Sequence, residues 1–151
     1  MKQTTFIMFK PDAIERNLVK RILGIFQENG LKIERTKEII VDEKLILTHY
    51  GEVIQKLNIP YFKDAVLTAF LGKKVFAYEI SKDSDDIVHE VRELVGATDP
   101  TKAQPDSIRG KFGNDSLAKS IAEKRMLNNL IHASDSKESA RDELKLWFGS
   151  K

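Results

Sequence analysis

The sequence predicts an α+β domain in which four strands form one antiparallel sheet, and two observations lead to that prediction. First, 151 residues with 41% hydrophobic and 32% charged content suit a single folded domain spanning residues 1–151. Second, β-rich segments and segments of helical apolar spacing follow the order strand, helix, strand, strand, helix, strand, helix, once a helical hairpin and one long loop are set aside. That order is the ferredoxin-like β-α-β-β-α-β pattern, here with a C-terminal helix added.

The first strand is predicted at residues 5–9, a nearly continuous apolar run typical of a strand covered on both faces. Helical apolar spacing begins at Ile14 and ends at Asn29 and Gly30, a C-cap signal, so we expect one helix there. Residues 31–41 are rich in Ile and Val but carry charges, which predicts a second strand with one wet face.

The middle of the chain predicts a helical hairpin, a strand and a helix. Apolar residues recur with helical spacing over 43–57 and 60–71, and the helix-breaking Pro60 separates the two arms. Residues 74–80 have the composition of a third strand. A helix is expected over 85–95, because its acidic start suits the positive end of the helix dipole.

The last third begins with a segment that has no periodic pattern. Residues 96–114 are expected to form a long structureless connection, and loops of that length are usually functional or disordered. Asp135 and Glu138 have the spacing of an N-terminal helix cap. The elements expected here are a short polar helix at 116–125, a fourth strand at 126–131 and a final helix at 136–148.

Composition excludes several classes of function. The sequence contains no cysteine, which excludes disulfide scaffolds, thiol catalysis and cysteine-based zinc sites, and fits a reducing cytosol. Lys and Arg total 25 against 23 for Asp and Glu, a balance that disfavours a dedicated nucleic-acid binder. No long apolar run resembles a membrane span. We therefore expect a cytoplasmic protein with neither a membrane nor a nucleic acid as its main partner.

His132 is the histidine with the most suggestive context. It follows an apolar strand and precedes a capped helix, although a histidine at such a junction is often purely structural. A histidine that acts as a nucleophile needs one ring nitrogen free and the other held by an acceptor, and Glu143 on the last helix is a candidate acceptor. Glu143 is otherwise a solvated helix acid. His49 and His89 lack such context, so we interpret them as surface or packing residues.

A second group of residues suits the binding of a polyphosphate. Lys10 ends the first strand, and Arg92 and Arg109 lie on either side of Thr98 in the polar segment. Guanidinium groups meet phosphate oxygens bidentately, and an ammonium group and a hydroxyl add further donors. The sequence has neither a P-loop nor a Rossmann glycine motif. A nucleotide site in this chain would therefore be built from side chains.

Four segments, taken in order, resemble the nucleoside diphosphate kinase family. They are residues 6–13 (FIMFKPDA), 96–100 (GATDP), 107–110 (SIRG) and 129–136 (NLIHASDS). The resemblance extends from residue 5 to Phe148, and four motifs in order are far more specific than any one of them.

The resemblance implies transfer of the terminal phosphate of a nucleoside triphosphate, usually ATP, to a nucleoside diphosphate. A phosphohistidine on His132 would carry the phosphate in a ping-pong mechanism that serves nucleotide homeostasis, with Mg²⁺ arriving on the nucleotide. A homo-oligomer, either a hexamer or a tetramer built from dimers, is also implied. The catalytic positions implied are His132, Glu143, Lys10 and Tyr50, and the nucleotide-binding positions are Lys10, Tyr61, Arg92, Thr98, Arg109 and Asn129.

Within that resemblance, Lys10 and Asn129 would meet the sugar and Tyr61 would stack on the base. A small insertion before Pro60 leaves Phe62 as an alternative to Tyr61. Such stacking uses the π-face of any base and therefore suits broad nucleotide specificity.

The chain also departs from the family pattern. The segment from Arg109 to His132 is longer than in ordinary members, which predicts a helical insertion near 114–126. Residues Asn128, Lys111 and Asp106 stand where arginine, aspartate and glycine are common. Two alternative functions stay open at this point: a non-enzymatic relative that kept the nucleotide pocket, and weak nucleic-acid binding.

Overall fold

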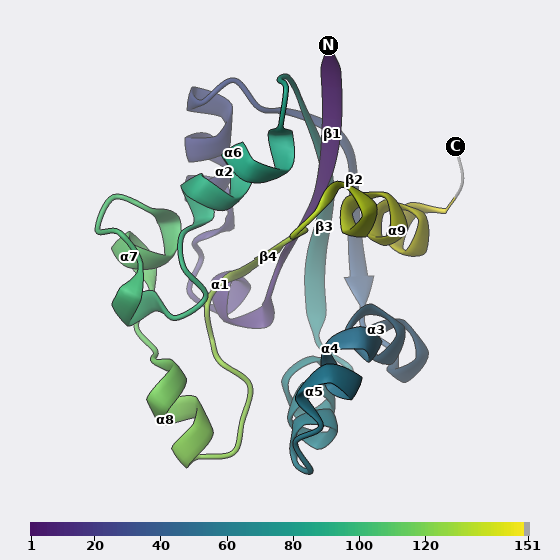
Figure 1. Cartoon of the computed structure of the whole chain (residues 1–151), viewed down its shortest axis with the longest axis vertical. Coiled ribbons are helices and arrows are strands. Elements are labelled where there is room, and N and C mark those ends of the chain that lie inside the picture. Colours follow the sequence, from purple (N-terminus) through teal and green to yellow (C-terminus); the bar gives the residue numbers. More distant parts are fainter. Residues whose placement is uncertain (150–151) are drawn as a thin grey trace.

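The computed structural model describes residues 1–149, and they contain one four-stranded antiparallel sheet (Figure 1). Its strands lie in the order β2-β3-β1-β4, and each neighbouring pair is antiparallel. The predicted α+β fold is thereby confirmed. The strands are β1 (Lys2–Phe9), β2 (Lys32–Ile40), β3 (Lys74–Asp83) and β4 (Ile131–Ala133).

Helices pack against both faces of the sheet. One face carries α1 (Pro11–Glu15), α2 (Val19–Glu28), α6 (Ile87–Val95) and α7 (Ile108–Phe112). The other carries α3 (Glu43–His49), α5 (Phe62–Phe70) and α9 (Lys137–Phe148), with α4 (Gly51–Leu57) beside α3. None of the helices within residues 1–149 has the length and apolar character required to cross a membrane.

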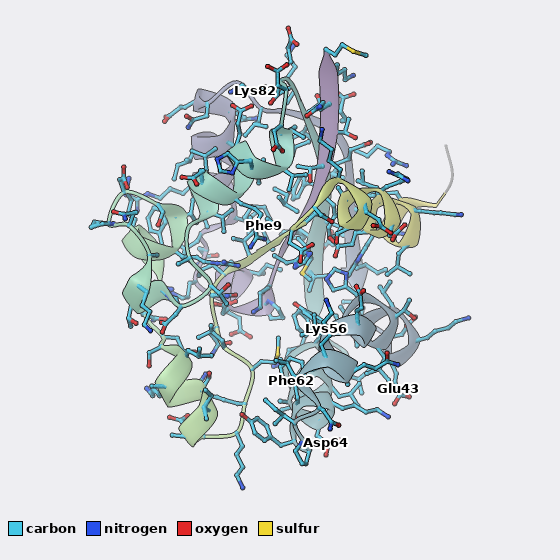
Figure 2. All side chains as sticks on the ribbon, in the orientation of Figure 1. Phe9, Glu43, Lys56, Phe62, Asp64 and Lys82 are labelled. Atoms are coloured by element: carbon cyan, nitrogen blue, oxygen red, sulfur yellow. The ribbon has the colours of Figure 1, made fainter. Side chains whose placement is uncertain are left out.

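Strand β1 lies between β3 and β4 and contributes to both cores. Ile7 and Phe9 pack on the α2 and α6 side, while Phe6 and Met8 pack on the α3, α5 and α9 side, and all four are fully buried. Side chains alternate between the faces of a strand, so a sheet covered on both faces needs a continuous apolar run. Figure 2 shows Phe9 in the interior between the layers.

Two predicted helices are each divided in the structure. The helix expected from Ile14 to Asn29 is α1 followed by α2, because Asn17 takes a left-handed conformation with φ of 57°. The first arm of the predicted hairpin is α3 followed by α4. The two helices meet at Tyr50. Its N–H donates to the Ile46 carbonyl in α3, and its carbonyl accepts from the Ile54 N–H in α4.

The prediction of a structureless connection over 96–114 is wrong. It contains a 3₁₀ helix, η1 (Pro100–Lys102), and α7. Asp99 caps η1 by accepting from the Thr101 N–H, and Ser107 caps α7 by accepting from the Gly110 N–H. These helices are too short to show an apolar period, so their caps were the only sequence signal.

The boundaries near the C-terminus also differ from prediction. The fourth strand is β4 and not residues 126–131, so His132 lies within the strand, opposite Met8 of β1. The chain turns before β4 because Leu130 has φ of 77°. Ser136, and not Asp135, caps α9 by accepting from the Ser139 N–H. The polar helix expected over 116–125 is present as α8 (Leu117–Ala122).

Truncating Phe6 tests the two-sided core. Phe6→Ala should lower the free energy of unfolding by about 3–5 kcal/mol, because it leaves a cavity beside Trp147, whose ring centroid is 5.5 Å from that of Phe6. Urea denaturation at fixed protein concentration measures the loss. Leu57→Ala is the control and should change stability by less than about 0.5 kcal/mol, because Leu57 is exposed. Equal losses in the two variants would contradict this assignment of the core.

Candidate active site

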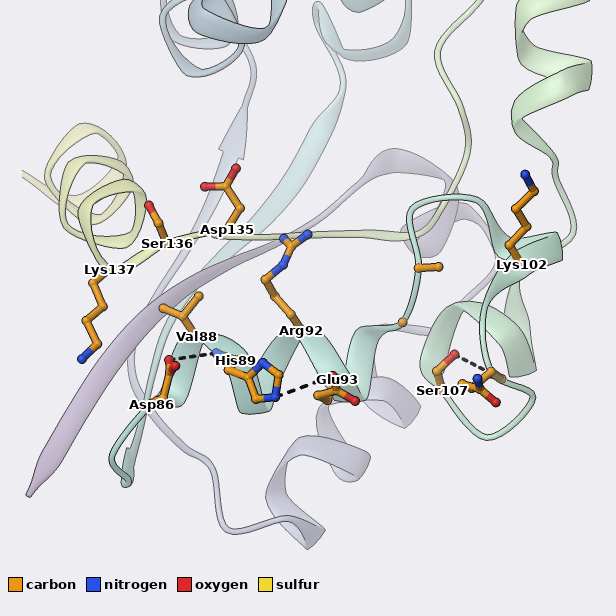
Figure 3. A pocket seen from close by; sticks show the side chains of 13 residues that line it. Asp86, Val88, His89, Arg92, Glu93, Lys102, Ser107, Asp135, Ser136 and Lys137 are labelled. Atoms are coloured by element: carbon orange, nitrogen blue, oxygen red, sulfur yellow. Dashed lines mark hydrogen bonds and ion pairs between the residues drawn. The ribbon is translucent and has the colours of Figure 1, made fainter.

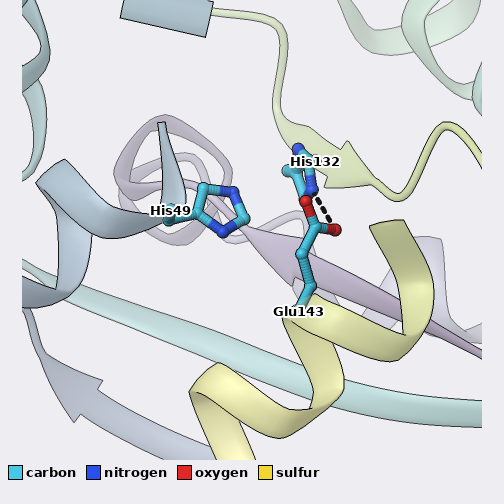
Figure 4. Close-up of side chains that lie close together, drawn as sticks. All are labelled: His49, His132 and Glu143. Carbon is cyan, nitrogen blue, oxygen red and sulfur yellow. Dashed lines mark hydrogen bonds and ion pairs between the residues drawn. The ribbon is translucent and has the colours of Figure 1, made fainter. Parts of the chain in front are cut away.

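The His132 side chain is fixed by a carboxylate of α9. His132 Nε2 lies 2.9 Å from Glu143 Oε1, and both side chains are mostly buried (Figure 4). An ionised carboxylate only accepts hydrogen bonds, so Nε2 is the ring nitrogen that carries the proton. The lone pair of the neutral ring therefore lies on Nδ1. The structure thus brings together the two residues that the sequence suggested as nucleophile and acceptor.

Glu143 is itself held in place by a second donor. Ser134 Oγ donates to the same oxygen, Oε1, at 2.5 Å, and Ser134 is buried directly after β4. Glu143 itself lies in α9, which follows β4 in the chain. Ser134 was not among the residues expected at the site, although it lies two positions after His132.

Tyr50 and His49 form an aromatic wall next to His132. The ring centroid of His132 is 6.3 Å from that of Tyr50 and 4.5 Å from that of His49, and both contacts are edge-on. Burial, followed by the charge of Glu143, raises the pKa of Tyr50 above its ordinary value. The phenol therefore keeps its proton and remains a hydrogen-bond donor at neutral pH.

His49 is held as a neutral ring. Burial, followed by the proximity of His132, lowers the pKa of His49 well below its ordinary value. Trp147 Nε1 donates to His49 Nδ1 at 3.0 Å, which leaves the His49 proton on Nε2. Possible ligand atoms of His49, His132 and Glu143 lie within 4.8 Å of one another. Within this cluster His132 and Glu143 are hydrogen-bonded to each other, whereas the buried His49 Nε2 has no hydrogen-bond partner among residues 1–149. Because both Nε2 atoms carry protons in these tautomers, we do not interpret the cluster as a metal centre.

Arg92 and Arg109 hold the backbone on either side of His132. Arg92 Nη1 donates to the Ala133 carbonyl at 3.1 Å, and Arg109 Nη2 donates to the Ile131 carbonyl at 2.6 Å. Arg109 also donates to the carbonyls of Asn129 and Gly96, both at 3.2 Å. A guanidinium has five N–H donors, so both side chains retain donors for an anion.

Lys10, Asn129 and Thr98 form a connected polar group. Lys10 Nζ donates to Asn129 Oδ1 at 2.9 Å and to the Leu127 carbonyl at 2.8 Å. Asn129 Nδ2 donates to the Thr98 carbonyl at 3.0 Å. Lys10 and Asn129 are buried, whereas Thr98 is exposed. Three of the predicted binding residues are thus joined although they are far apart in the sequence.

Asp12 was not expected at the site, but it fixes the turn that precedes His132. Its Oδ2 accepts from the Leu130 N–H at 3.1 Å, and the Lys10 N–H donates to the Leu130 carbonyl at 2.9 Å. A positive φ is unusual for a branched residue such as Leu130 and requires support from its surroundings. The only signal for Asp12 in the sequence is its position directly after Lys10 and Pro11.

Two of the cations at the site, Lys10 and Arg109, are buried, whereas Arg92 is exposed. Burial, opposed in part by Asp12, lowers the pKa of Lys10 to about 8. Burial and then the charge of Arg92 lower the pKa of Arg109 to about 10. Each shift reports the energetic cost of a charge removed from water, and a bound anion would offset that cost.

Tyr61 directly precedes α5, and Arg92 lies on α6. Tyr61 is partly exposed at the start of α5, whereas Phe62 packs against the core beneath the hairpin. Arg92 also lines a cleft of about 780 Å³ between α6, the loop after it and the start of α9 (Figure 3). Asp135 lines the same cleft.

Comparison with known proteins assigns the family. The family model described as nucleoside diphosphate kinase matches residues 3–151. The chain belongs to the nucleoside diphosphate kinase family. The nucleoside diphosphate kinase of Methanosphaera stadtmanae is 41% identical over 148 residues, which cover 98% of this chain and 87% of that protein. The nucleoside diphosphate kinase of Staphylococcus aureus is 36% identical over 146 residues, which cover 97% of this chain and 87% of that protein.

Solved structures of the nucleoside diphosphate kinase family agree in fold. The Borrelia burgdorferi enzyme has a TM-score of 0.90 and 31% identity, over 97% of this chain and 87% of that chain. That structure is described as a transition-state mimic with bound vanadate and ADP. An NDP kinase from Pyrobaculum aerophilum has a TM-score of 0.86 and 28% identity, over 98% of this chain and 96% of that chain.

Substitutions at Asp12 test its role in the turn. Asp12→Ala removes the acceptor of the Leu130 N–H and should lower kcat/KM for phosphate exchange by about tenfold or more, because a buried donor is left unpaired. Asp12→Asn keeps an oxygen acceptor, so its kcat/KM should fall less. Steady-state kinetics on both variants measure the difference. Equal losses would show that the charge of Asp12, and not its hydrogen bond, matters.

Proposed function

We propose that this chain exchanges phosphate between nucleoside triphosphates and diphosphates by placing the phosphoryl group on Nδ1 of His132. The observation that supports this most directly is the hydrogen bond between His132 Nε2 and Glu143, because it leaves Nδ1 with the lone pair. Membership of the family and the bound vanadate and ADP of the Borrelia burgdorferi relative agree with the proposal.

In the first half-reaction His132 Nδ1 bonds to the terminal phosphorus, and the bond from that phosphorus to the bridging oxygen breaks. The diphosphate leaves with those electrons, and the imidazole gains positive charge. Glu143 stabilises that charge through the Nε2 proton, which need not move. The second half-reaction reverses these steps with a new diphosphate, which gives ping-pong kinetics.

The arginines supply charge for the transferred phosphoryl group. Its loose transition state spreads negative charge over three oxygens, so positioned donors accomplish most of the catalysis. Arg109 donates to the carbonyl directly before His132 and Arg92 to the carbonyl directly after it, which supports their assignment to the phosphoryl group. Tyr50, which keeps its proton, is a further donor beside the imidazole.

The remaining residues are assigned to the nucleoside. Following the family resemblance, Lys10 and Asn129 are assigned to the sugar and Thr98 to the phosphates. The hydrogen bonds that join Lys10 to Asn129 and Asn129 to the Thr98 backbone carbonyl support one shared binding group. Tyr61 is assigned to the base. Phe62, the alternative, packs against the core, which supports Tyr61 as the stacking ring.

We assign Mg²⁺ to the nucleotide and not to a protein cage. Mg²⁺ prefers oxygen ligands and usually binds substrate phosphates with one or two carboxylates. Within residues 1–149, the group of three potential ligands at the site contains two imidazoles, a donor set that does not suit this ion. Bound to the phosphates, the ion would neutralise charge that Arg92 and Arg109 also face.

We also propose a homo-oligomer, either a hexamer or a tetramer built from dimers. Strand β2 is an edge of the sheet, and it exposes Ile33 and Ile40, at 40% and 59%. An open strand edge with apolar side chains readily pairs with another chain, which supports an interface at this edge.

The phosphohistidine is tested by labelling. After incubation with ATP labelled at its terminal phosphate, the unchanged chain should carry acid-labile, base-stable label, and His132→Asn should carry none. ATP-to-GDP exchange should vanish in His132→Asn. Glu143→Gln keeps an acceptor but loses the charge, so kcat should fall by about 10- to 100-fold. Full exchange in His132→Asn would refute the mechanism. Nucleotide binding without exchange in the unchanged chain would favour the non-enzymatic alternative.

The pKa of Lys10 predicts how activity depends on pH. Lys10 loses its charge as pH rises through about 8, so kcat/KM for ATP, which reports on the free enzyme, should fall above that pH. Bound phosphate favours the charged amine, so kcat should fall only at higher pH. Lys10→Met should have low activity without this alkaline limb. A flat kcat/KM profile up to about pH 9.5 would contradict the prediction.

A further inference from the structure

Asp115 is a buried carboxylate that accepts four hydrogen bonds. Arg125 donates from Nη1 to Oδ2 at 2.7 Å and from Nη2 to Oδ1 at 2.8 Å. The backbone N–H groups of Ser116 and Asn128 donate at 2.9 Å each. The Asp115 side chain is only 5% exposed, and its hydrogen bonds, that of Arg125 above all, lower its pKa well below the ordinary value. The carboxylate therefore stays ionised and fixed at neutral pH.

The Asn128 bond connects Asp115 to the site. Asn128 lies between the two residues that receive Lys10 Nζ, namely Leu127 through its carbonyl and Asn129 through its side chain. Asp115 thus fixes the peptide at the centre of the three-residue segment that orients Lys10. No catalytic or binding role assigned so far uses Asp115, Arg125 or Asn128.

The charge of Asp115 acts on Lys10 as well. It raises the pKa of Lys10, although burial is the largest effect and Asp12 raises that pKa more. Without the charges of Asp12 and Asp115, Lys10 and Arg109 would make this part of the site strongly cationic. Asp115 therefore has two independent effects on Lys10, one through geometry and one through charge.

We propose that Asp115 is a positioning residue for recognition of the nucleotide sugar. It acts by fixing the segment 127–129 against Lys10. The proposal rests on the proposed assignment of Lys10 and Asn129 to the sugar. It gives the segment that was expected as an insertion near 114–126 a role in specificity, because Asp115 and Arg125 both belong to it.

Two variants and one matched control test the proposal. Asp115→Asn replaces one acceptor oxygen by an NH2 group, so it removes two of the four hydrogen bonds and takes the charge from the other two. Arg125→Gln removes the ion pair while leaving Asp115 free to accept from Asn128. Glu123→Gln is the control. Glu123 is an exposed partner of the same arginine, with Oε1 2.9 Å from Arg125 Nε, and this ion pair does not involve the 127–129 segment. Circular dichroism must first show that each variant is folded.

The measurement is calorimetric binding of GDP and of 3′-deoxy-GDP, which needs no turnover. Asp115→Asn should weaken GDP binding by about tenfold and 3′-deoxy-GDP binding by much less, so the preference for the sugar hydroxyl falls. Arg125→Gln should have a smaller effect in the same direction, and Glu123→Gln none. The alkaline fall of kcat/KM should also move to lower pH in Asp115→Asn, whereas kcat at pH 7 should change little.

Other outcomes would overturn the proposal. Equal weakening of both ligands, or a fall in kcat with unchanged binding, would show that Asp115 supports the fold or the chemistry and not sugar recognition. An Asp115→Asn protein that is unfolded leaves Arg125→Gln as the test, and wild-type preference in that variant would overturn the proposal. If the unchanged chain labels on His132 but shows no preference for GDP over 3′-deoxy-GDP, the assignment of Lys10 and Asn129 to the sugar fails and the phosphohistidine mechanism stands.

Discussion

The geometry of the site depends on the left-handed turn at Leu130. This residue, with φ of 77°, separates the polar side chain of Asn129 from the strand that carries His132. Its N–H is held by Asp12, its carbonyl by the Lys10 N–H, and the adjacent carbonyls of Asn129 and Ile131 by Arg109. A strained backbone persists only where its surroundings over-determine it, and here Lys10 between β1 and α1, Asp12 of α1 and Arg109 of α7 do so. The same bonds that support the strain therefore set the distance between the Asn129 side chain and His132.

The charges of Lys10 and Arg109 explain why residues that support the turn are also proposed to bind the nucleotide. Lys10 and Arg109 are removed from water, and their depressed pKa values show that the protein alone does not compensate them fully. Backbone carbonyls satisfy part of their hydrogen-bonding capacity, but a carbonyl carries no net charge. The proposed anionic nucleotide would supply the charge that the carbonyls lack, so its binding would offset the cost of burying these two cations. Asp12 and Asp115 limit that cost without cancelling it, since both raise the pKa of Lys10.

The sequence predicted those parts of the fold that a regular apolar pattern encodes. The buried run of β1 and the apolar face of α6 were found because packing on a covered sheet imposes a period. The division at Asn17, the turn at Leu130 and the short helices η1 and α7 were missed, since each depends on a single residue or cap. For the site, His132, Glu143 and the cations could be suggested from their chemistry. Asp12, Ser134 and Asp115 could not. Asp12 and Asp115 accept from backbone N–H groups of another part of the chain, and Ser134 donates to a side chain on the next helix.

The hydrogen bonds of the imidazoles determine which reaction the site can perform. A histidine with both nitrogens available could act as a base or bind a metal, but His132 presents one proton to Glu143 and one lone pair elsewhere. His49 cannot take the place of His132, because Trp147 occupies its acceptor nitrogen and burial keeps the ring neutral. Glu143 in turn is held by Ser134, so the tautomer of His132 does not fluctuate with solvent. A nucleophile with a fixed tautomer suits reversible phosphoryl transfer, because the same ring nitrogen must accept and release the group without a proton transfer in either direction.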